Sequence, residues 1–126
     1  MNVLGIDIGG SGVKGAIVDI KSGELLSEKI RFPTPNKPTP KKIFDGIKSN
    51  ILDELKWDGN VGCGFPGVVK KNKIYSAANI EKKWIGLNLK KKFHKKFNLR
   101  CKAINDADAA GLSEIALNPN VLNSCL

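Results

Sequence analysis

The segment over residues 6–15 brings an acid, a glycine-rich turn and a lysine together in an order that suits phosphate chemistry. An apolar run over residues 3–8 includes Asp7 and leads into three glycines, after which a second apolar run begins at Val13. This pattern predicts a β-hairpin, and glycine in its loop permits positive φ and close approach of the backbone to a ligand. Consecutive loop N–H groups form a concavity that binds anions, so the segment predicts a phosphate site.

Each polar group of this loop has an expected role. Lys14 adds a positive point charge, and Asp7 is expected to hold a metal ion through water. The residues expected to bind phosphate are Asp7, Gly9, Gly10, Ser11, Gly12 and Lys14. The loop matches neither a P-loop nor a dinucleotide fingerprint, because both continue into a helix and a strand is predicted here. The alternative is a plain tight hairpin, since glycines also mark turns.

Length and composition indicate one domain with a packed core. The chain has 126 residues, of which 41% are hydrophobic. No stretch approaches the about 20 apolar residues of a membrane span, and no signal-peptide pattern opens the sequence. Three scattered cysteines without metal-ligand spacing favour a reduced setting, with Cys63 and Cys101 buried in strands. We therefore expect a cytoplasmic protein that does not enter a membrane.

The net charge of +9 indicates affinity for polyanions such as nucleic acid, an anionic membrane or polyphosphate. No recognisable DNA- or RNA-binding motif accompanies this charge, so specific nucleic-acid binding is not expected. The alternative is general surface charge, in which Lys90–Lys92 and Lys95–Lys96 form the solvated face of one helix. The single histidine, His94, lies among these lysines and is expected at the surface.

Apolar periodicity predicts a mixed sheet with helices packed on it. Thr39 is placed to cap a helix that begins at Pro40, and apolar residues repeat at every fourth position from Ile43 to Leu55. Strands are expected over residues 3–8, 13–20, 24–32, 61–65 and 100–104, a hairpin over 68–75, and further helices over 89–97 and 106–117. Three antiparallel strands followed by alternating strands and helices place the chain in the α/β class.

Four ordered motifs resemble those of one protein family. They are DIGGSGVKG at 7–15, VGCGFPGVV at 61–69, SAANIEKKWIG at 76–86 and NDADAAG at 105–111. Their order and spacing resemble the N-terminal domain of ROK-type sugar kinases, and within that group those of polyphosphate glucokinase type, over roughly residues 1–117. The resemblance implies an actin-like ATPase (ribonuclease H-like) fold, with a mixed sheet flanked by helices.

The resemblance also implies roles for individual residues. Asp106 matches the catalytic base, which takes the proton from a sugar hydroxyl, and Asn105 matches a sugar-hydroxyl binder. Gly67 and Asn79 fall in segments that line the sugar pocket in the family. For Asn105 and Asp106 the alternative is a helix cap, and for Gly67 a tight turn. Trp84 either packs against the sugar loop or belongs to the core.

The implied activity is transfer of a terminal phosphoryl group from polyphosphate or ATP to the 6-hydroxyl of glucose, with Mg²⁺ bridging phosphate oxygens. Family enzymes have a second domain, and the resemblance admits a homodimer for the intact enzyme. Residues 118–126 resemble nothing in the family, so we expect a kinase domain over 1–117, an atypical tail, no second domain and no activity of the chain alone. Two alternatives remain open: a non-catalytic sugar-binding or regulatory remnant, and a basic polyanion-binding module.

Overall fold

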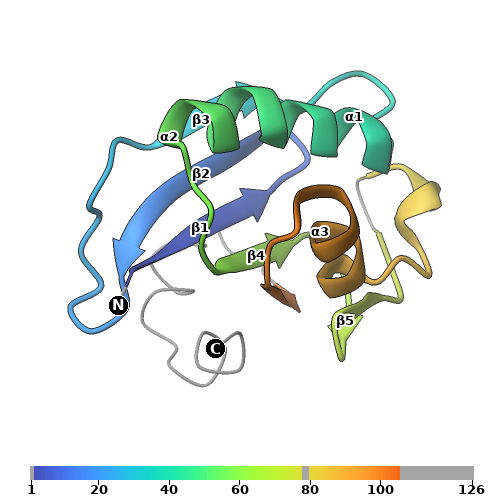
Figure 1. The fold of residues 1–126 in the computed structure, drawn as a ribbon. Coiled ribbons are helices and arrows are strands. Elements are labelled where there is room, and N and C mark those ends of the chain that lie inside the picture. Colours follow the sequence, from blue (N-terminus) through green and yellow to red (C-terminus); the bar gives the residue numbers. More distant parts are fainter. Residues whose placement is uncertain (1, 78–79, 106–126) are drawn as a thin grey trace.

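The computed structural model describes residues 2–77 and 80–105. A five-stranded sheet forms the centre of the fold, in the order β3-β2-β1-β4-β7 (Figure 1). Its strands are β1 (Asn2–Ile8), β2 (Gly12–Asp19), β3 (Ile30–Pro33), β4 (Val61–Phe65) and β7 (Cys101–Asn105). Strand β1 pairs antiparallel with β2 and parallel with β4, and β4 pairs parallel with β7. The mixed sheet predicted from the sequence is confirmed.

Helices pack against one face of this sheet (Figure 1). They are the contiguous segments α1 (Pro40–Gly46), η1 (Ile47–Leu52) and α2 (Asp53–Leu55), together with α3 (Leu89–Phe97). Thr39 caps α1 as predicted, because its side-chain oxygen accepts the backbone N–H of Lys42 at 3.4 Å. The segment η1 is a π-helix, whose wider turn suits an apolar repeat at every fourth position, and Ile47 and Ile51 are fully buried.

An aromatic cluster joins α1 to α3 and to the sheet. The Phe44 ring centroid lies 5.0 Å from that of Phe93 and 5.9 Å from that of Trp84, and the Trp84 ring lies 5.1 Å from Phe65. Trp84 ends the 3-10 helix η2 (Lys82–Trp84), is fully buried, and donates its indole N–H to the carbonyl of Pro38 at 2.7 Å. Of the two alternatives for this tryptophan, the core is therefore the correct one.

Other expectations for buried and exposed residues are also confirmed. Cys63 and Cys101 are free thiols buried in β4 and β7, and His94 is exposed on α3. None of the helices in the described part of the chain is long and apolar enough to cross a membrane.

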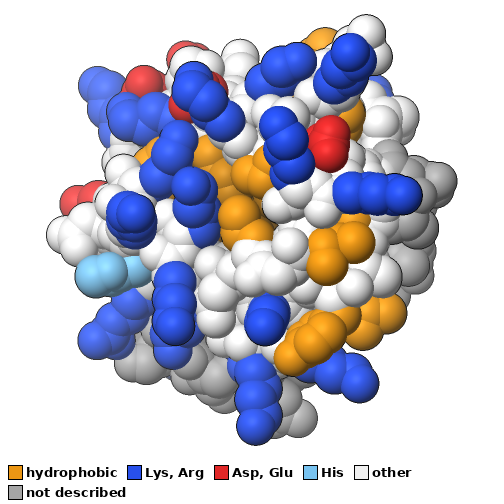
Figure 2. Space-filling view, turned by 90° about the vertical axis from the view of Figure 1, so that its right-hand side faces the viewer, with side chains coloured by type: hydrophobic (Ala, Val, Ile, Leu, Met, Phe, Trp, Pro, Cys, Tyr) orange, Lys and Arg blue, Asp and Glu red, His pale blue; other side chains and the backbone are white. Residues whose placement is uncertain are grey.

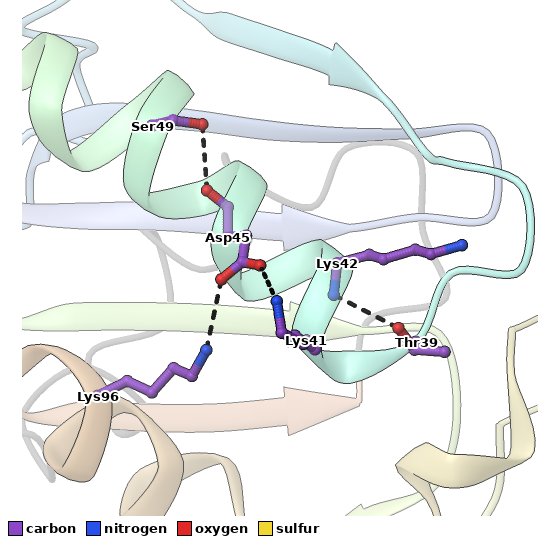
Figure 3. Close-up of polar contacts among 6 residues, drawn as sticks. All are labelled: Thr39, Lys41, Lys42, Asp45, Ser49 and Lys96. Carbon is purple, nitrogen blue, oxygen red and sulfur yellow. Dashed lines mark hydrogen bonds and ion pairs between the residues drawn. The ribbon is translucent and has the colours of Figure 1, made fainter.

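An exposed carboxylate links α1 to α3 across the surface (Figure 3). Asp45 accepts a hydrogen bond from Lys41 Nζ at 2.9 Å and lies 3.5 Å from Lys96 Nζ. The hydrogen bond from Lys41 lowers the pKa of Asp45 below its ordinary value. Since the folded-state pKa is the lower one, the contribution to stability is present above the ordinary pKa and is lost as the pH falls through the lowered one. Because Asp45 is exposed to solvent, this contribution is small.

The predicted strand over residues 24–32 is wrong for most of its length. Only β3 pairs continuously with β2, while Leu25 forms an isolated bridge with Val18. Between these pairings the Ser27 hydroxyl accepts the N–H of Ile17 at 2.9 Å, in place of a backbone carbonyl. A side chain therefore interrupts the ladder, which apolar alternation does not reveal.

The predicted hairpin after β4 is confirmed. Its strands are β5 (Val69–Lys70) and β6 (Lys73–Ile74), and both turn residues, Lys71 and Asn72, have positive φ, at 50° and 67°. A two-residue turn with positive φ at both positions matches the right-handed twist of the strands that it joins. The helix expected over 106–117 lies outside the described residues.

We predict that Phe44→Ala lowers the free energy of unfolding by about 3–5 kcal/mol, because it leaves a cavity where α1, α3 and η2 meet. Urea denaturation of the 126-residue chain measures the change. Leu26→Ala is the matched control, since Leu26 is 50% exposed and its truncation should change stability by no more than about 0.5 kcal/mol. Equal effects of the two substitutions would contradict this account of the core.

Candidate active site

Three of the predicted motifs meet at one edge of the sheet. Strands β1, β4 and β7 are parallel, so their carboxyl ends point the same way, and a cleft at that edge is the usual ligand site of α/β sheets. The loop over 9–11 follows β1, the turn at Pro66–Gly67 follows β4, and Asn105 is the last residue of β7. Asn105 pairs with Phe65, which places the last motif directly beside the second.

Asp7 lies close to this edge in the centre of the sheet. Its neighbours in register are Lys14 on β2 and Gly64 on β4. Ile6 and Ile8 belong to the core on the helical side, and side chains alternate along a strand, so Asp7 projects from the opposite face. The residue is 8% exposed. A buried carboxylate beside a glycine-rich loop is an oxygen donor of the kind that Mg²⁺ accepts, together with water and phosphate oxygens.

The glycine-rich loop is fixed by hydrogen bonds to itself and to the segment after β3. The N–H of Gly9 donates to the carbonyl of Gly12 at 3.0 Å, and the carbonyl of Gly9 accepts the Thr34 hydroxyl at 2.7 Å. The N–H of Thr34 donates to the carbonyl of Ser11 at 3.3 Å. Among the described residues no hydrogen bond occupies the N–H of Gly10 or Ser11, and both residues are exposed. These two donors are therefore available to an anion.

The glycines of the loop serve close approach and not a left-handed backbone. Of the glycines in the described part of the chain, Gly23 and Gly86 have positive φ, whereas Gly9 and Gly12 do not. A Cβ on Gly9 would lie 2.8 Å from the carbonyl oxygen of Gly12, and a Cβ on Gly12 would lie 2.6 Å from Arg31 Nε. Of the two properties that glycine permits, this loop therefore uses close approach, because neighbouring groups occupy the space of a Cβ at Gly9 and Gly12.

Gly67 has a packing role that needs no ligand. A Cβ at this position would lie 2.0 Å from the carbonyl oxygen of Ser76, so the chain after β6 passes directly over the glycine. The N–H of Val68 donates to the Ser76 hydroxyl at 2.9 Å, and the N–H of Tyr75 donates to the carbonyl of Val68 at 2.8 Å. The turn and the hairpin thus form one unit at the edge of the site.

Of the residues expected to act on the sugar, Gly67 and Asn105 belong to the described part of the chain. Asn79 and Asp106 lie outside the described residues, and for Asn105 the backbone position on β7 is defined. The residues that the structure brings together are the glycine-rich loop, Asp7, Lys14, Gly67 and the backbone of Asn105.

Arg31 also lies beside the glycine-rich loop, which the sequence did not predict. It pairs with Lys14, which pairs with Asp7, so one carboxylate and two cations form a row across three strands. A basic residue in the strand predicted over residues 24–32 was the feature that could have indicated it. The register of this strand was not predictable, because its pairing with β2 is interrupted.

Comparison with known proteins identifies the class to which this fold and site belong. The model of the ROK family matches residues 3–122, and the chain belongs to that family. It is 40% identical over 112 residues to a polyphosphate glucokinase of Mycobacterium tuberculosis, covering 88% of this chain and 42% of that protein. It is 34% identical over 117 residues to a glucokinase of Streptomyces coelicolor, covering 88% of this chain and 34% of the relative. The chain thus spans less than half the length of these relatives.

Solved structures agree with this assignment. The inorganic polyphosphate/ATP-glucomannokinase of an Arthrobacter strain is 37% identical, with a TM-score of 0.79 over 91% of this chain and 48% of that one. A ROK family glucokinase of Streptomyces griseus, in complex with glucose and AMPPNP, is 31% identical, with a TM-score of 0.73 over 87% of this chain and 35% of that one. The actin-like fold and the sugar-kinase family expected from the motifs are confirmed.

We predict that Gly67→Ala destabilises the chain by about 1–3 kcal/mol, because the added Cβ meets backbone atoms of Ser76 that cannot rotate away. Thermal and urea unfolding measure the loss. Val68→Ala in the same turn is the control, since Val68 is 42% exposed and should tolerate truncation. A Gly67→Ala chain as stable as the Val68→Ala chain would show that Ser76 can move aside.

Proposed function

We propose that the chain supplies the phosphate loop and the catalytic base of a glucokinase, which transfers the terminal phosphoryl group of polyphosphate to the 6-hydroxyl of glucose. ATP is the second candidate donor. The observation that carries this proposal is the meeting of the glycine loop, the Gly67 turn and the end of β7 at one sheet edge, in a chain of the ROK family. The names of the relatives, polyphosphate glucokinase and glucokinase, support the choice of sugar and donor.

In this mechanism each residue acts on one partner. Asp106 takes the proton of the sugar hydroxyl as the oxygen attacks the terminal phosphorus, so the charge of the attacking oxygen never develops fully. Asn105, Gly67 and Asn79 position the sugar, so that the hydroxyl faces the base. The unbonded N–H groups of Gly10 and Ser11 indicate a phosphate site beside them, because loop donors of this kind bind anions.

Mg²⁺ is the metal that the donor chemistry requires, and it neutralises charge on the phosphate oxygens when bound. Asp7 is the described residue suited to hold it, through water, because its carboxylate is a hard oxygen ligand at the mouth of the loop. Within the described residues no group of three or more His, Cys, Asp or Glu side chains forms a metal cluster. Such an arrangement suits an ion that is held largely by phosphate and water.

Positive charge near the site edge supports polyphosphate as the donor. Residues 70–102 contain twelve lysines and arginines and one acid, Glu81. Figure 2 shows basic side chains spread over the face that carries α3 and the β5–β6 hairpin, with few acids among them. Lys82 and Lys83 lie on η2, and Lys90–Lys92 lie in the first turns of α3, which runs back toward the start of β7 from the site edge. Lys14 projects from the opposite face of the sheet and is not part of this surface.

The chain spans 42% of the length of the M. tuberculosis relative, so we propose that the whole enzyme includes more protein than these 126 residues. We propose a kinase domain over residues 1–117 and a tail over 118–126, although the family match continues to residue 122. Because phosphoryl transfer depends on a preorganised donor site, half of a cleft should not turn over. We further propose that the chain works in the cytoplasm, and that the intact enzyme is a homodimer.

We predict that Asp106→Asn, in a chimaera of this chain with the remaining part of the M. tuberculosis relative, lowers kcat by about 10²–10⁴-fold and leaves the KM for glucose largely unchanged. Steady-state kinetics with polyphosphate and Mg²⁺ measure both constants. Asp108→Asn is the matched control, two residues along the chain, and should retain the parent kcat. A chimaera without glucose-dependent transfer would favour the non-catalytic alternatives, and normal kcat in the Asp106 variant would remove this residue as the base.

We also predict that the isolated chain binds long polyphosphate more tightly than tripolyphosphate, because a longer polymer engages more lysines at once. Added salt should weaken this binding, since exposed charges are screened beyond about 8 Å at physiological ionic strength. Replacing Lys90 and Lys91 by Gln should reduce the dependence on polymer length, measured by titration with polymers of graded length. The same replacement of Lys21 and Lys56, near the opposite edge of the sheet, is the control. Affinity that does not depend on polymer length would leave the basic surface without a role in donor binding.

A further inference from the structure

Arg31 reaches from the edge strand β3 onto the phosphate loop. The position that a Cβ would take on Gly12 lies 2.6 Å from Arg31 Nε, 2.8 Å from Nη2 and 3.1 Å from Cζ. The guanidinium group therefore lies against the backbone of Gly12, in space that is open because this residue has no side chain. Arg31 is nevertheless exposed to solvent, so its remaining donors can reach a ligand.

The charges around Arg31 leave room for an anion. Arg31 pairs across the strands with Lys14, and two cations directly opposite each other are unfavourable unless a negative charge lies near. In the described part of the chain no ion pair joins either cation to an acid. Asp7 lies beside Lys14 on the other side of the row, so the three side chains carry one net positive charge, and the strand register holds Arg31 next to Lys14.

The donors on this side of the loop fit an oligophosphate. An arginine offers a planar fork that matches two oxygens of one phosphate group, whereas a lysine offers a single point charge. The N–H groups of Gly10 and Ser11 are two residues and one residue away from Gly12, against which the guanidinium group lies. One phosphate group at the loop and a second at Arg31 and Lys14 would satisfy all of these donors.

We infer that Arg31 is a further phosphate-binding residue of this site, which grips a phosphate group of the inorganic oligophosphate donor next to the group bound by the loop. This inference rests on the proposed function, because it assumes that the loop holds the donor. Gly12 is then required because it leaves the space in which the Arg31 guanidinium group lies.

Isothermal titration of the 126-residue chain with inorganic tripolyphosphate tests the inference. Arg31→Ala should weaken binding by about 10–100-fold, as expected for a lost hydrogen bond to a charged group. Arg31→Lys should recover only part of the affinity, because it restores the charge without the fork. Lys29→Ala removes an exposed charge two residues away and should have little effect. Melting temperatures of all variants show whether the fold is retained.

A double-mutant cycle shows whether Arg31 acts through its contact with Gly12 or through its charge alone. Gly12→Ala should displace the guanidinium and weaken tripolyphosphate binding, yet it should add little in a chain that already carries Arg31→Ala. Independent, additive effects would overturn the coupling between Gly12 and Arg31. Equal affinities of the Arg31→Ala and Lys29→Ala chains, or no tripolyphosphate binding by the parent chain, would overturn the inference itself.

The chimaera distinguishes this inference from the proposed function. If it phosphorylates glucose with polyphosphate while Arg31→Ala leaves the KM for polyphosphate unchanged, the inference fails and the proposed function stands. If it transfers no phosphoryl group to glucose while the isolated chain loses tripolyphosphate affinity on Arg31→Ala, the proposed function fails and Arg31 remains an oligophosphate ligand.

Discussion

The pairing of β1 with a different partner on each side is the constraint on which the rest of the structure depends. On one side the chain turns back at once through the glycine loop, so β1 and β2 are antiparallel. On the other side β4 returns only after the helical segment over residues 40–55, and it runs parallel to β1. Because β7 repeats this parallel crossing through α3, the carboxyl ends of three strands share one edge. Segments separated by some 55 and 95 residues along the chain thereby become neighbours.

The helical side of the sheet gives that edge its rigidity. Phe44 on α1, Phe93 on α3 and Trp84 on η2 pack in one cluster with Phe65, the last residue of β4. The Trp84 indole also donates to the carbonyl of Pro38, which ties the connection before α1 to the segment before α3. The turn after Phe65 therefore starts from a residue that is packed on the helical side, and Ser76 closes over Gly67 from above. A site loop that begins in the core is held in place before any ligand binds.

Features of the fold that arise from neighbouring residues were predicted from the sequence, whereas features that depend on distant parts of the chain were not. Thr39 and Pro40 announce the start of α1, and the strand over residues 61–65 is a short apolar run between turn residues, so both were predicted to within a residue. The meeting of the motifs at one edge follows from the parallel order of β1, β4 and β7, which was not predicted. The break near Ser27 and the π-helical turn over 47–52 could not be predicted, since the first depends on a side chain that replaces a backbone partner across the sheet. The second was not predicted, because an apolar repeat such as Ile47 and Ile51 is equally typical of an α-helix.

The glycines of the site show why composition alone gives an incomplete account of it. A glycine-rich loop is commonly explained by backbone freedom, yet Gly9, Gly12 and Gly67 are each defined by an atom that lies where a Cβ would be. For Gly9 and Gly67 that atom is a backbone oxygen, so these glycines permit the chain to pack against itself. For Gly12 the atom belongs to the side chain of Arg31 on β3. Packing of the backbone against itself therefore does not explain why a guanidinium group lies there. A cation that lies against a loop with unbonded N–H groups is stabilised when an anion binds between them. Gly12 thus serves the binding of a ligand, whereas Gly9 and Gly67 serve the packing of the backbone against itself.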